Sequence, residues 1–466
     1  MTGTHKLLPL IASLVAILLL SSLLSNKYYH YHYVTPAIIA ISTAFAKPHT
    51  VAPPTLAGPI ILNDPHLKIE TVFKGLDAPT SMAFVGPDDI LVLEKDEGIV
   101  QRIIDGKMVS EPLLEVPVAT KVDRGMLGIA ISKHEDGPTY IFLYYTESGG
   151  KTGDDRAGIQ PVGNRVYRYE LDYDHDKLIN PKLLVTLPAI PRKPLSPETN
   201  DNGGTIRVGP DNDVYFVIGQ VGSHQGQAQN VNRGPGLDGT GGILRVTQDG
   251  QPVPNPPLGN NTYPSNLYYA YGIRNSFGLD FDPITGNLWD TENGPDFGDE
   301  INLVIPGFNS GWEQVQGIWT REHLDAMGPV APLQSNSLVN FGGRGIYHVP
   351  QFTWNKTIGP TAIKFFNSDK LGEQYENDIF VSDIDNGNIY HFKLNQQRDG
   401  LLLGGSLGNN VAYTTKDSQQ AEFATGFGGI TDLQVGPGDG YLYVLSYTGG
   451  TIYRIVPSTS EDSDSK

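Results

Sequence analysis

The sequence predicts an all-β fold, a six-bladed β-propeller preceded by an N-terminal hydrophobic segment. Glycine (54 residues) and proline (34 residues) are abundant, and only 18% of the 466 residues are charged. This balance is typical of many short strands joined by turns. A strand–turn–strand pattern with period-2 alternation returns along the chain, and no apolar stripe of helical length accompanies it. Repetition of such a unit indicates a propeller.

Residues 1–46 predict a signal anchor or a signal peptide. Residues 7–24 are uncharged and almost wholly apolar, which is about the minimum length for a membrane span. A Tyr/His-rich stretch follows, as at a membrane interface, and a second apolar run ends in a small-x-small cleavage pattern, Ala44-Phe45-Ala46. Both interpretations place the bulk of the chain outside the cytoplasm, secreted or membrane-anchored through this segment only. A cytoplasmic protein is the remaining alternative.

Residues 47–66 carry five prolines and predict a semi-extended linker, and the acidic residues 458–466 predict a disordered tail. Between them, residues 67–457 hold six copies of the repeated pattern, at 82–104, 127–147, 205–222, 278–294, 362–395 and 432–457. A closed ring of such units hides the strand edges that a single sheet exposes. Residues 67–76 are expected to add the outer strand of the last copy. Two β-sandwiches in tandem are the alternative.

Charge and cysteine content exclude several classes of function. The net charge of −18 argues against a nucleic-acid partner, because phosphate binding needs a basic surface. The absence of cysteine excludes disulfides, thiolate metal sites and cysteine nucleophiles. Acidity favours solubility and divalent cations instead.

Three stretches differ from ordinary turn sequences. "YGIRNSFGLDF" places Arg274 and Asn275 before a strand, and "TENGPDFGDEINL" combines acids with Gly294-Pro295, whose carbonyls could face a calcium ion. "TNDNGG" holds Asp201 in a glycine loop suited to close approach of a ligand. The alternative for Arg274 is a structural ion pair, and for the other two a plain turn.

The order of seven motifs resembles the soluble glucose/sorbosone dehydrogenases. They are "RGMLGIAI", "DNGGTIRVGPDNDVYF", "GGILRV", "YGIRNSFGLDFDPITGNLW", "TENGPDFGDEINL", "GFNSGW" and "GPGDGYLYVLSYTGGTIYRI". The family members are six-bladed propellers that oxidise aldose sugars with pyrroloquinoline quinone (PQQ) and calcium. The resemblance runs from residue 67 to 457. It implies a small sugar as substrate, PQQ and calcium as cofactors, and an electron acceptor as a further partner.

The resemblance also implies residue roles. In the family, a histidine accepts the proton of the sugar hydroxyl, an aspartate orients it, an arginine stabilises the reacting quinone oxygen, and Gly-Pro carbonyls hold calcium. Here Asp201 stands at the histidine position and Gln220 at the orienting aspartate. The implied catalytic residues are therefore Arg274 and Asp201, and the implied cofactor-binding residues are Asn275 and Gln220. Calcium would be held by Gly294 and Pro295.

Several positions depart from the family pattern. Phe277 replaces a glutamine, residues 429–432 read Gly-Ile-Thr-Asp where the family has Arg-Ile-Arg-Asp, and residues 383–388 read "DIDNGN" where it has a basic segment. PQQ has three carboxylates, so the loss of cations predicts weaker binding. An aspartate is a weaker base than a histidine, and His224 is an alternative base. A non-catalytic propeller that binds carbohydrate or protein, and a calcium-assisted lactonase, stay open as alternatives.

Overall fold

The computed structural model describes residues 58–135, 137–190, 200–222, 229–230, 236–259, 261–320 and 338–458. Contacts divide the chain into Met1–Ala52 and Pro53–Lys466, and every described residue belongs to the second unit. The expected anchor, most of the linker, all but the first residue of the acidic tail, and His224 therefore lie outside the described residues. Within the described ranges, the chain forms no helix that is both long and apolar enough to span a membrane.

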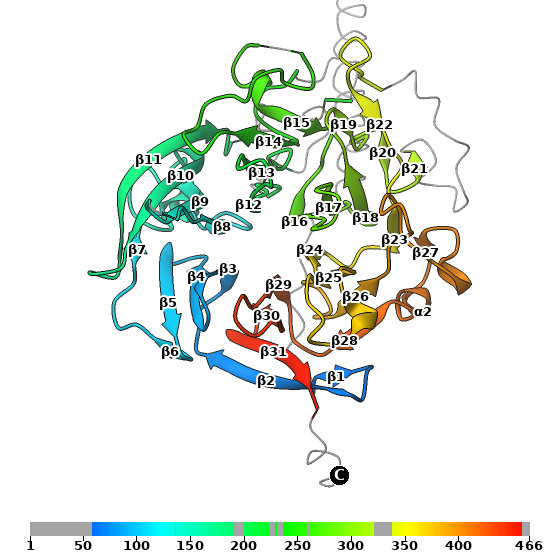
Figure 1. Ribbon diagram of the computed structural model, residues 1–466. Coiled ribbons are helices and arrows are strands. Elements are labelled where there is room, and N and C mark those ends of the chain that lie inside the picture. Colours follow the sequence, from blue (N-terminus) through cyan, green and yellow to red (C-terminus); the bar gives the residue numbers. More distant parts are fainter. Residues whose placement is uncertain are drawn as a thin grey trace, which may run out of the picture. The chain divides into compact units, whose positions relative to one another are not determined.

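The described chain is an all-β propeller, as predicted. Its sheets stand side by side in a ring, and each sheet presents one inner strand to the centre (Figure 1). We name each sheet by this strand. The inner strands are β3 (Pro79–Gly86), β8 (Met126–Ser132), β12 (Ile206–Val208), β16 (Ser276–Phe281), β24 (Pro360–Phe365) and β29 (Ile430–Val435).

The remaining strands follow outward in each sheet. The β3 sheet adds β4 (Asp89–Glu94), β5 (Ile99–Ile104), β6 (Lys107–Met108) and β7 (Leu114–Glu115), and the β8 sheet adds β9 (Tyr140–Glu147), β10 (Gly163–Asp172) and β11 (Lys177–Leu187). The β12 sheet adds β13 (Val214–Ile218), β14 (Gly242–Val246), β15 (Tyr268–Tyr271), β19 (Phe308–Asn309) and β22 (Ile346–Tyr347). The β16 sheet adds β17 (Leu288–Glu292), β18 (Phe297–Val304), β23 (Phe352–Lys356) and β27 (Val411–Ala412).

The last two sheets contain the first strands of the chain. The β24 sheet adds β25 (Ile379–Asp383), β26 (Ile389–Phe392), β28 (Glu422–Thr425) and β1 (Ile61–Leu62), and the β29 sheet adds β30 (Leu442–Ser446), β31 (Thr451–Pro457) and β2 (Leu67–Lys74). A separate hairpin joins β20 (Val315–Gln316) to β21 (Trp319–Thr320). The short helices are α2 (Thr415–Ser418) and the 3₁₀ turns η1 (Asp154–Ala157), η2 (Ser265–Leu267), η5 (Glu373–Tyr375) and η6 (Gly405–Leu407).

Strand β2 closes the ring, as residues 67–76 were expected to do. It pairs antiparallel with β31 from Leu67↔Pro457 to Lys74↔Thr451. Strand β1, within the stretch expected to be a linker, pairs with β28 in the adjacent sheet. The start of the described chain is thus bound to two sheets that come last in the sequence.

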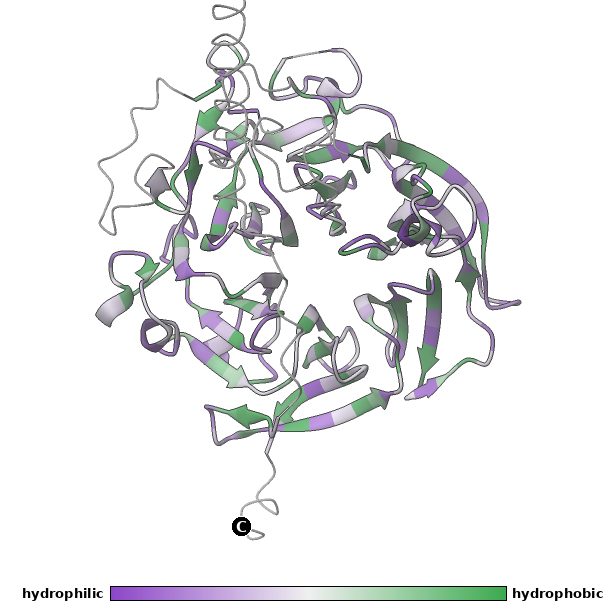
Figure 2. Cartoon of the chain, turned by 180° about the vertical axis from the view of Figure 1, so that it is seen from behind, coloured by the Kyte–Doolittle hydropathy of each residue, from purple (hydrophilic) through white to green (hydrophobic). Residues whose placement is uncertain are grey.

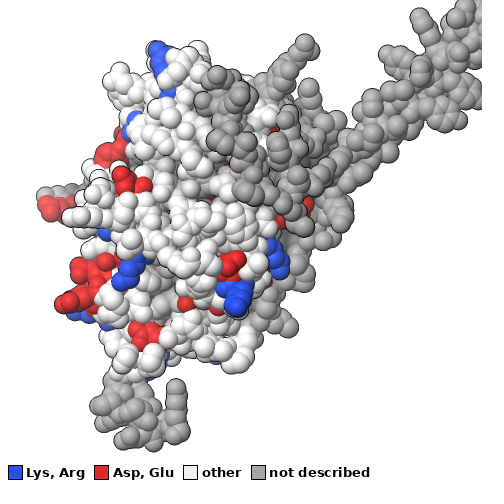
Figure 3. Space-filling model, turned by 90° about the vertical axis from the view of Figure 1, so that its right-hand side faces the viewer, with Lys and Arg blue, Asp and Glu red and all other residues white. Residues whose placement is uncertain are grey.

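Hydrophobic clusters lie between successive sheets and hold the ring together. Phe142 of the β8 sheet packs in one cluster with Phe216 of the β12 sheet, and Trp289 of the β16 sheet packs in another with Val381 of the β24 sheet. Figure 2 shows hydrophobic residues on the strands around the ring, interspersed with hydrophilic ones. On the face drawn in Figure 3, acidic and basic side chains are interspersed at the surface. Burial of the apolar faces is the main favourable term in such packing.

A turn with an aspartate recurs and explains part of the sequence repeat. Tyr215 donates its hydroxyl to Asp211 at 2.8 Å, and Tyr443 donates to Asp439 at the same distance. An arginine of the third strand pairs with the same aspartate, as Arg454 does with Asp439 at 3.2 Å. The aspartate of these Gly-Pro-containing turns therefore connects the turn to the second and third strands of the same sheet.

Candidate active site

The "TNDNGG" loop lies between β13 and β8 and leads into β12. Asp201 has a φ of 61°, in the left-handed region. A Cβ on Gly203 would lie 2.5 Å from the Val217 carbonyl oxygen, and one on Gly204 would lie 2.5 Å from Cβ of Leu127. Only glycine fits these two positions, so the loop can lie directly on the neighbouring strands. This close packing fixes where the Asp201 side chain points.

Asp201 is buried and held by two other predicted site residues. Its exposed fraction is 3%. The Gln220 side-chain amide donates to Asp201 Oδ2 at 2.9 Å. The Arg274 guanidinium nitrogen Nη2 lies 3.5 Å from Asp201 Oδ1, which is an ion pair but longer than a good hydrogen bond. The structure therefore brings Asp201, Gln220 and Arg274 together, although their sequence positions span more than seventy residues.

Arg274 is positioned by the start of the neighbouring loop. Its backbone N–H donates to Glu292 Oε1 at 2.7 Å, and its Nη1 donates to the Asn293 carbonyl at 3.0 Å. Within the described residues, Arg274 Nε is buried and has no hydrogen-bond partner. A buried guanidinium with a free N–H is suited to an acceptor oxygen of a ligand.

Trp312 completes the cluster and was not predicted. Its indole N–H donates to Gln220 Oε1 at 2.7 Å, and the Arg274 guanidinium lies 5.7 Å from the centre of its ring. Gln220 thus receives a donor on its oxygen and gives its own donor to Asp201, which fixes the orientation of its amide. We define the Asp201 cluster as Asp201, Gln220, Arg274 and Trp312.

Asn275 supports the loop. Its Oδ1 accepts the backbone N–H of Gly203 at 3.0 Å, and its carbonyl accepts the N–H of Asn293 at 2.8 Å. The side chain that the family resemblance implies for cofactor binding is therefore engaged, through its oxygen, in holding the "TNDNGG" loop.

Asp123 is a further acidic residue next to the cluster that was not predicted. It accepts the backbone N–H of Asn202 at 3.1 Å and the Asn202 side-chain amide at 2.7 Å. Burial, together with the negative charge of Asp201, raises the pKa of Asp123 to about 6. Asp123 directly precedes the "RGMLGIAI" motif, and this position is the sequence feature that could have identified it as a candidate site residue.

Gly294 and Pro295 form a turn held by Asp299. Gly294 N–H donates to Asp299 Oδ1 at 2.8 Å, while Asp299 Oδ2 accepts the N–H groups of Ile358 and Gly359 at 2.6 and 3.0 Å. A Cβ on Gly294 would clash with the Phe297 carbonyl. No group of three or more His, Asp or Glu side chains arranged for a metal occurs in the described ranges. Calcium here would thus depend on main-chain carbonyls.

Buried acids lie behind Arg274 on one face of β17 and β18. Glu292 pairs across the strands with Glu300, and Asp290 pairs with Asn302. Burial raises the pKa of Asp290 to about 7 and that of Glu300 to about 8, and it raises the pKa of Glu292 as well. These carboxyls are costly to ionise, because each is removed from water.

Two aspartates in the segments that differ from the family pattern, Asp383 and Asp432, form hydrogen bonds with nearby loops and strands. Asp383 is fully buried and accepts the N–H groups of Asn386 and Gly387 in its own turn at 2.7 and 2.8 Å. Asp432 accepts the Ser81 hydroxyl at 2.9 Å and lies 3.5 Å from the Arg207 guanidinium. Both carboxylates thus stabilise loops and inner strands.

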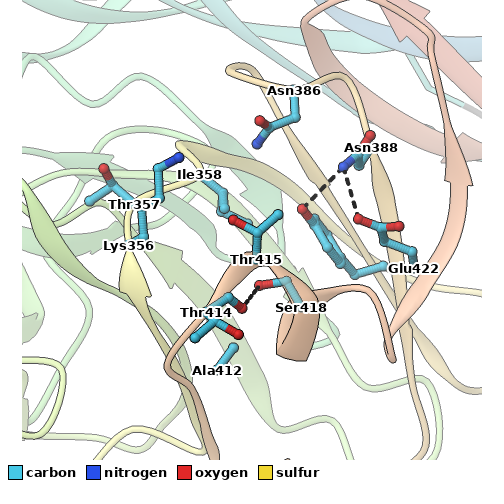
Figure 4. Close-up of a pocket in the computed structure, with 11 residues that line it drawn as sticks. Lys356, Thr357, Ile358, Asn386, Asn388, Ala412, Thr414, Thr415, Ser418 and Glu422 are labelled. Carbon is cyan, nitrogen blue, oxygen red and sulfur yellow. Dashed lines mark hydrogen bonds between the residues drawn. The ribbon is translucent and has the colours of Figure 1, made fainter.

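A separate small surface pocket lies between the β16 and β24 sheets (Figure 4). Its side chains are largely polar, and Asn388 donates to Tyr390 at 3.4 Å and to Glu422 at 3.3 Å. None of its lining residues belongs to the Asp201 cluster. Asp201, Gln220 and Arg274 converge elsewhere, on the loops that precede β12, follow β13 and follow β15.

The fold and cluster define a propeller with a buried carboxylate and guanidinium and a half-buried indole beside the start of its inner strands. Residues 76–454 match the family model described as Glucose / Sorbosone dehydrogenase, and the chain belongs to this family. This agrees with the resemblance inferred from the motifs.

Two relatives and one solved structure illustrate the similarity. Aldose sugar dehydrogenase YliI from Escherichia coli is 24% identical, over 91% of this chain and 98% of that protein. Quinoprotein glucose dehydrogenase B from Acinetobacter calcoaceticus is 30% identical, over 53% of this chain and 52% of that protein. The PQQ-bound form of aldose sugar dehydrogenase from Streptomyces coelicolor has a TM-score of 0.58 and 22% identity, covering 87% of this chain and all of that chain.

Proposed function

We propose that this protein oxidises a hydroxyl of an aldose or related sugar, with PQQ as the electron-accepting cofactor and Asp201 as the proton acceptor. The observation that carries this proposal is the buried Asp201 carboxylate, held by Gln220 and facing Arg274. The family membership and the names of the quinoprotein relatives support it.

Asp201 and Gln220 are complementary in a way that preserves the function of an oriented base. A histidine base needs an acceptor to orient its ring N–H, whereas a carboxylate base needs a donor. Gln220 supplies such a donor at 2.9 Å. Oriented general bases contribute roughly 10²- to 10⁴-fold to a rate. The second oxygen of Asp201 faces Arg274 and is available to accept the proton of a sugar hydroxyl.

Arg274 and Trp312 supply the remaining functions of the site. The Arg274 guanidinium is always charged and stabilises negative charge that develops on the reacting oxygen. The Trp312 ring offers an apolar face for the sugar ring, while its N–H is already used by Gln220. Together with Asp201, these side chains bind, orient and deprotonate a polyhydroxy substrate.

The residues present fit the reacting edge of PQQ, which would supply the acceptor for the hydride. Arg274 would hold a quinone oxygen through its free Nε. Three cations of the described chain already have carboxylate partners: Lys95 with Asp96, Arg124 with Asp155, and Arg207 with Asp432. We therefore expect PQQ to bind more weakly here than in a site with free cations for its carboxylates.

Calcium and the blade count are further parts of the proposal. The carbonyls of Gly294 and Pro295, in the turn held by Asp299, would hold a calcium ion next to the cofactor.

The ring is proposed to have six blades, which six described sheets of at least four strands support.

We also propose that residues 1–46 export or anchor the protein, because of the apolar stretch of residues 7–24. Fractionation of cells that express the full chain tests this. Recovery in the membrane or outside the cell is expected, and recovery only in the cytoplasm would contradict it.

The activity is tested with the purified full chain, PQQ and calcium, by measuring reduction of a dye with glucose as substrate. Reduction should require PQQ and saturate with its concentration. Arg274→Ala should abolish it, whereas Arg245→Ala, which removes an arginine paired with Asp211 in an outer turn, should not. Lack of any PQQ-dependent reduction with a panel of aldoses would refute the proposed function.

A further inference from the structure

The Asp123 carboxylate carries a charge that no described cation balances. It is partly exposed beside the Asp201 cluster, and its described hydrogen bonds come from the Asn202 backbone and side-chain amide. Within the described residues, no lysine, arginine or histidine forms an ion pair with Asp123. Each of its oxygens accepts one hydrogen bond, and an ionised carboxylate can accept about four in all. Asp123 can therefore bind a further donor.

The charged groups that face Asp123 do not neutralise it. Asp201 adds a second negative charge, and the Tyr144 hydroxyl, which donates to the Asn202 carbonyl at 2.8 Å, is neutral. Lys95 attracts Asp123 but is paired with Asp96 at 2.7 Å, and the adjacent Arg124 is paired with Asp155 at 3.1 Å.

Arg274 balances only one of the two site carboxylates. It pairs with Asp201, so Asp123, Asp201 and Arg274 together leave one negative charge at the candidate site. A partly buried charge without an opposite partner is costly, and a cationic ligand would relieve this cost.

We propose that the substrate of this site is an amino sugar, an aldose with a protonated amino group beside the hydroxyl that is oxidised, and that Asp123 binds that ammonium group. The proposal rests on the proposed function and specifies its substrate. Asn202 links the two carboxylates, because it follows Asp201 in the chain and contacts Asp123 through two hydrogen bonds. In the proposed complex, a hydroxyl would bind at Asp201 and an ammonium group of the same sugar at Asp123.

The net charge of the whole chain also favours a cationic substrate. The chain has a net charge of −18, which attracts cations and repels anions. A bound quinone with three carboxylates would add negative charge near the site and would strengthen the preference for a cationic substrate. An uncharged sugar gains nothing from either effect.

The test is calorimetric binding of glucosamine, N-acetylglucosamine and glucose to the full chain without PQQ, at pH 7 and low salt. Glucosamine should bind at least about tenfold more tightly than the two neutral sugars, which is the ratio that one charge-assisted hydrogen bond supplies. Asp123→Asn should remove this preference. Asp105→Asn is the matched control, since it removes the same charge from an exposed turn and should keep the preference.

A second measurement on the wild type is independent of any folding defect in the variant. The preference for glucosamine should disappear as the pH falls below about 6, because Asp123 takes up a proton while the amine of the ligand stays charged. Equal affinity of the wild type for glucosamine and glucose at pH 7, or an unchanged preference in Asp123→Asn, would overturn the proposal. PQQ-dependent oxidation of glucose could still be observed in that case, so the proposed function is judged separately.

Discussion

Asp201 and Gln220 are complementary in their hydrogen bonding, since a carboxylate accepts and a primary amide donates. The amide of Gln220 is fixed by the Trp312 indole on one side and by Asp201 on the other. Such a chain holds one oxygen of Asp201 on Gln220 and leaves the other oxygen toward Arg274. Under the proposed function, the joint substitution of both family residues would preserve an oriented base.

Gln220→Glu tests this orientation. The new carboxylate would face Asp201 with a like charge, so kcat should fall by roughly 100-fold, and the acidic limb of the pH–rate profile should move to higher pH. Gln220→Met, which has a similar size and no charge, should lower kcat without moving that limb. A Glu variant with the pH profile of the wild type would contradict a direct contact between the two side chains during catalysis.

The motif resemblance predicted which residues would meet but not how they would be used. Asp201, Gln220 and Arg274 come together as the aligned loops implied. Trp312 and Asp123 were missed, because neither lies in a motif position whose chemistry is evident from neighbouring residues. Asn275 was expected to contact a cofactor, whereas its oxygen holds Gly203, a role that depends on a loop-to-loop distance that no sequence pattern contains.

At the scale of the strand, the β17–β18 pair is unusual because polar residues occupy its buried face. "TENGPDFGDEINL" predicted a turn with acids, and the turn at Gly294 is present. The cross-strand register also places Asp290 opposite Asn302 on the inward face. Alternation indicates which residues share a face, but it does not indicate that an acidic face is the buried one.

Asp290→Asn should stabilise the protein at alkaline pH. The pKa of Asp290 is raised by burial to about 7 from an ordinary value of 3.8. The unfolded chain therefore loses this proton first, and stability is lost as the pH rises from about 4 toward 7. The variant removes that loss, and its amide can donate to Asn302 Oδ1, which has no partner among the described residues.

The gain in the free energy of unfolding should be on the order of 3 kcal/mol at pH 8 and close to zero at pH 4. Urea denaturation at both pH values measures it. A variant that is less stable than the wild type at pH 8, or equally stabilised at both pH values, would show that Asp290 is not a protonated buried carboxyl.

At the scale of the whole molecule, the repeat predicted the fold well. Each of the six predicted copies falls within one sheet, because alternation and Gly-Pro-containing turns reflect local chemistry such as the Tyr443–Asp439 contact. Pairing between strands that lie far apart in the sequence was harder to predict from the sequence. β2 was expected to close the last sheet, but β1 was assigned to a linker, since a strand of two residues, Ile61–Leu62, carries no pattern of its own.

Ring closure by β2 and β31 can be tested with a disulfide. Glu70 lies directly opposite Arg454, and the two form an ion pair at 2.8 Å, so their side chains face each other. Glu70→Cys with Arg454→Cys would link positions 384 residues apart in a chain that has no other cysteine. Oxidation should raise the thermal midpoint, with an upper estimate of about 6 kcal/mol from loop entropy.

The loss of the ion pair itself should matter little, because surface pairs contribute roughly 0–1 kcal/mol. The reduced double variant is the control. Failure of the disulfide to form on oxidation, or a thermal midpoint that is the same in the oxidised and reduced forms, would contradict the pairing of β2 with β31.

The most direct measurement is the rate of sugar oxidation by Asp201→Asn in the presence of saturating PQQ and calcium. Asparagine keeps the shape of the side chain but cannot accept the proton. If Asp201 is the base, kcat should fall by at least about 100-fold while the dissociation constant of the sugar changes by only a few-fold. A variant that retains more than about a third of the wild-type kcat would show that another group accepts the proton and that the Asp201 cluster is not the catalytic centre.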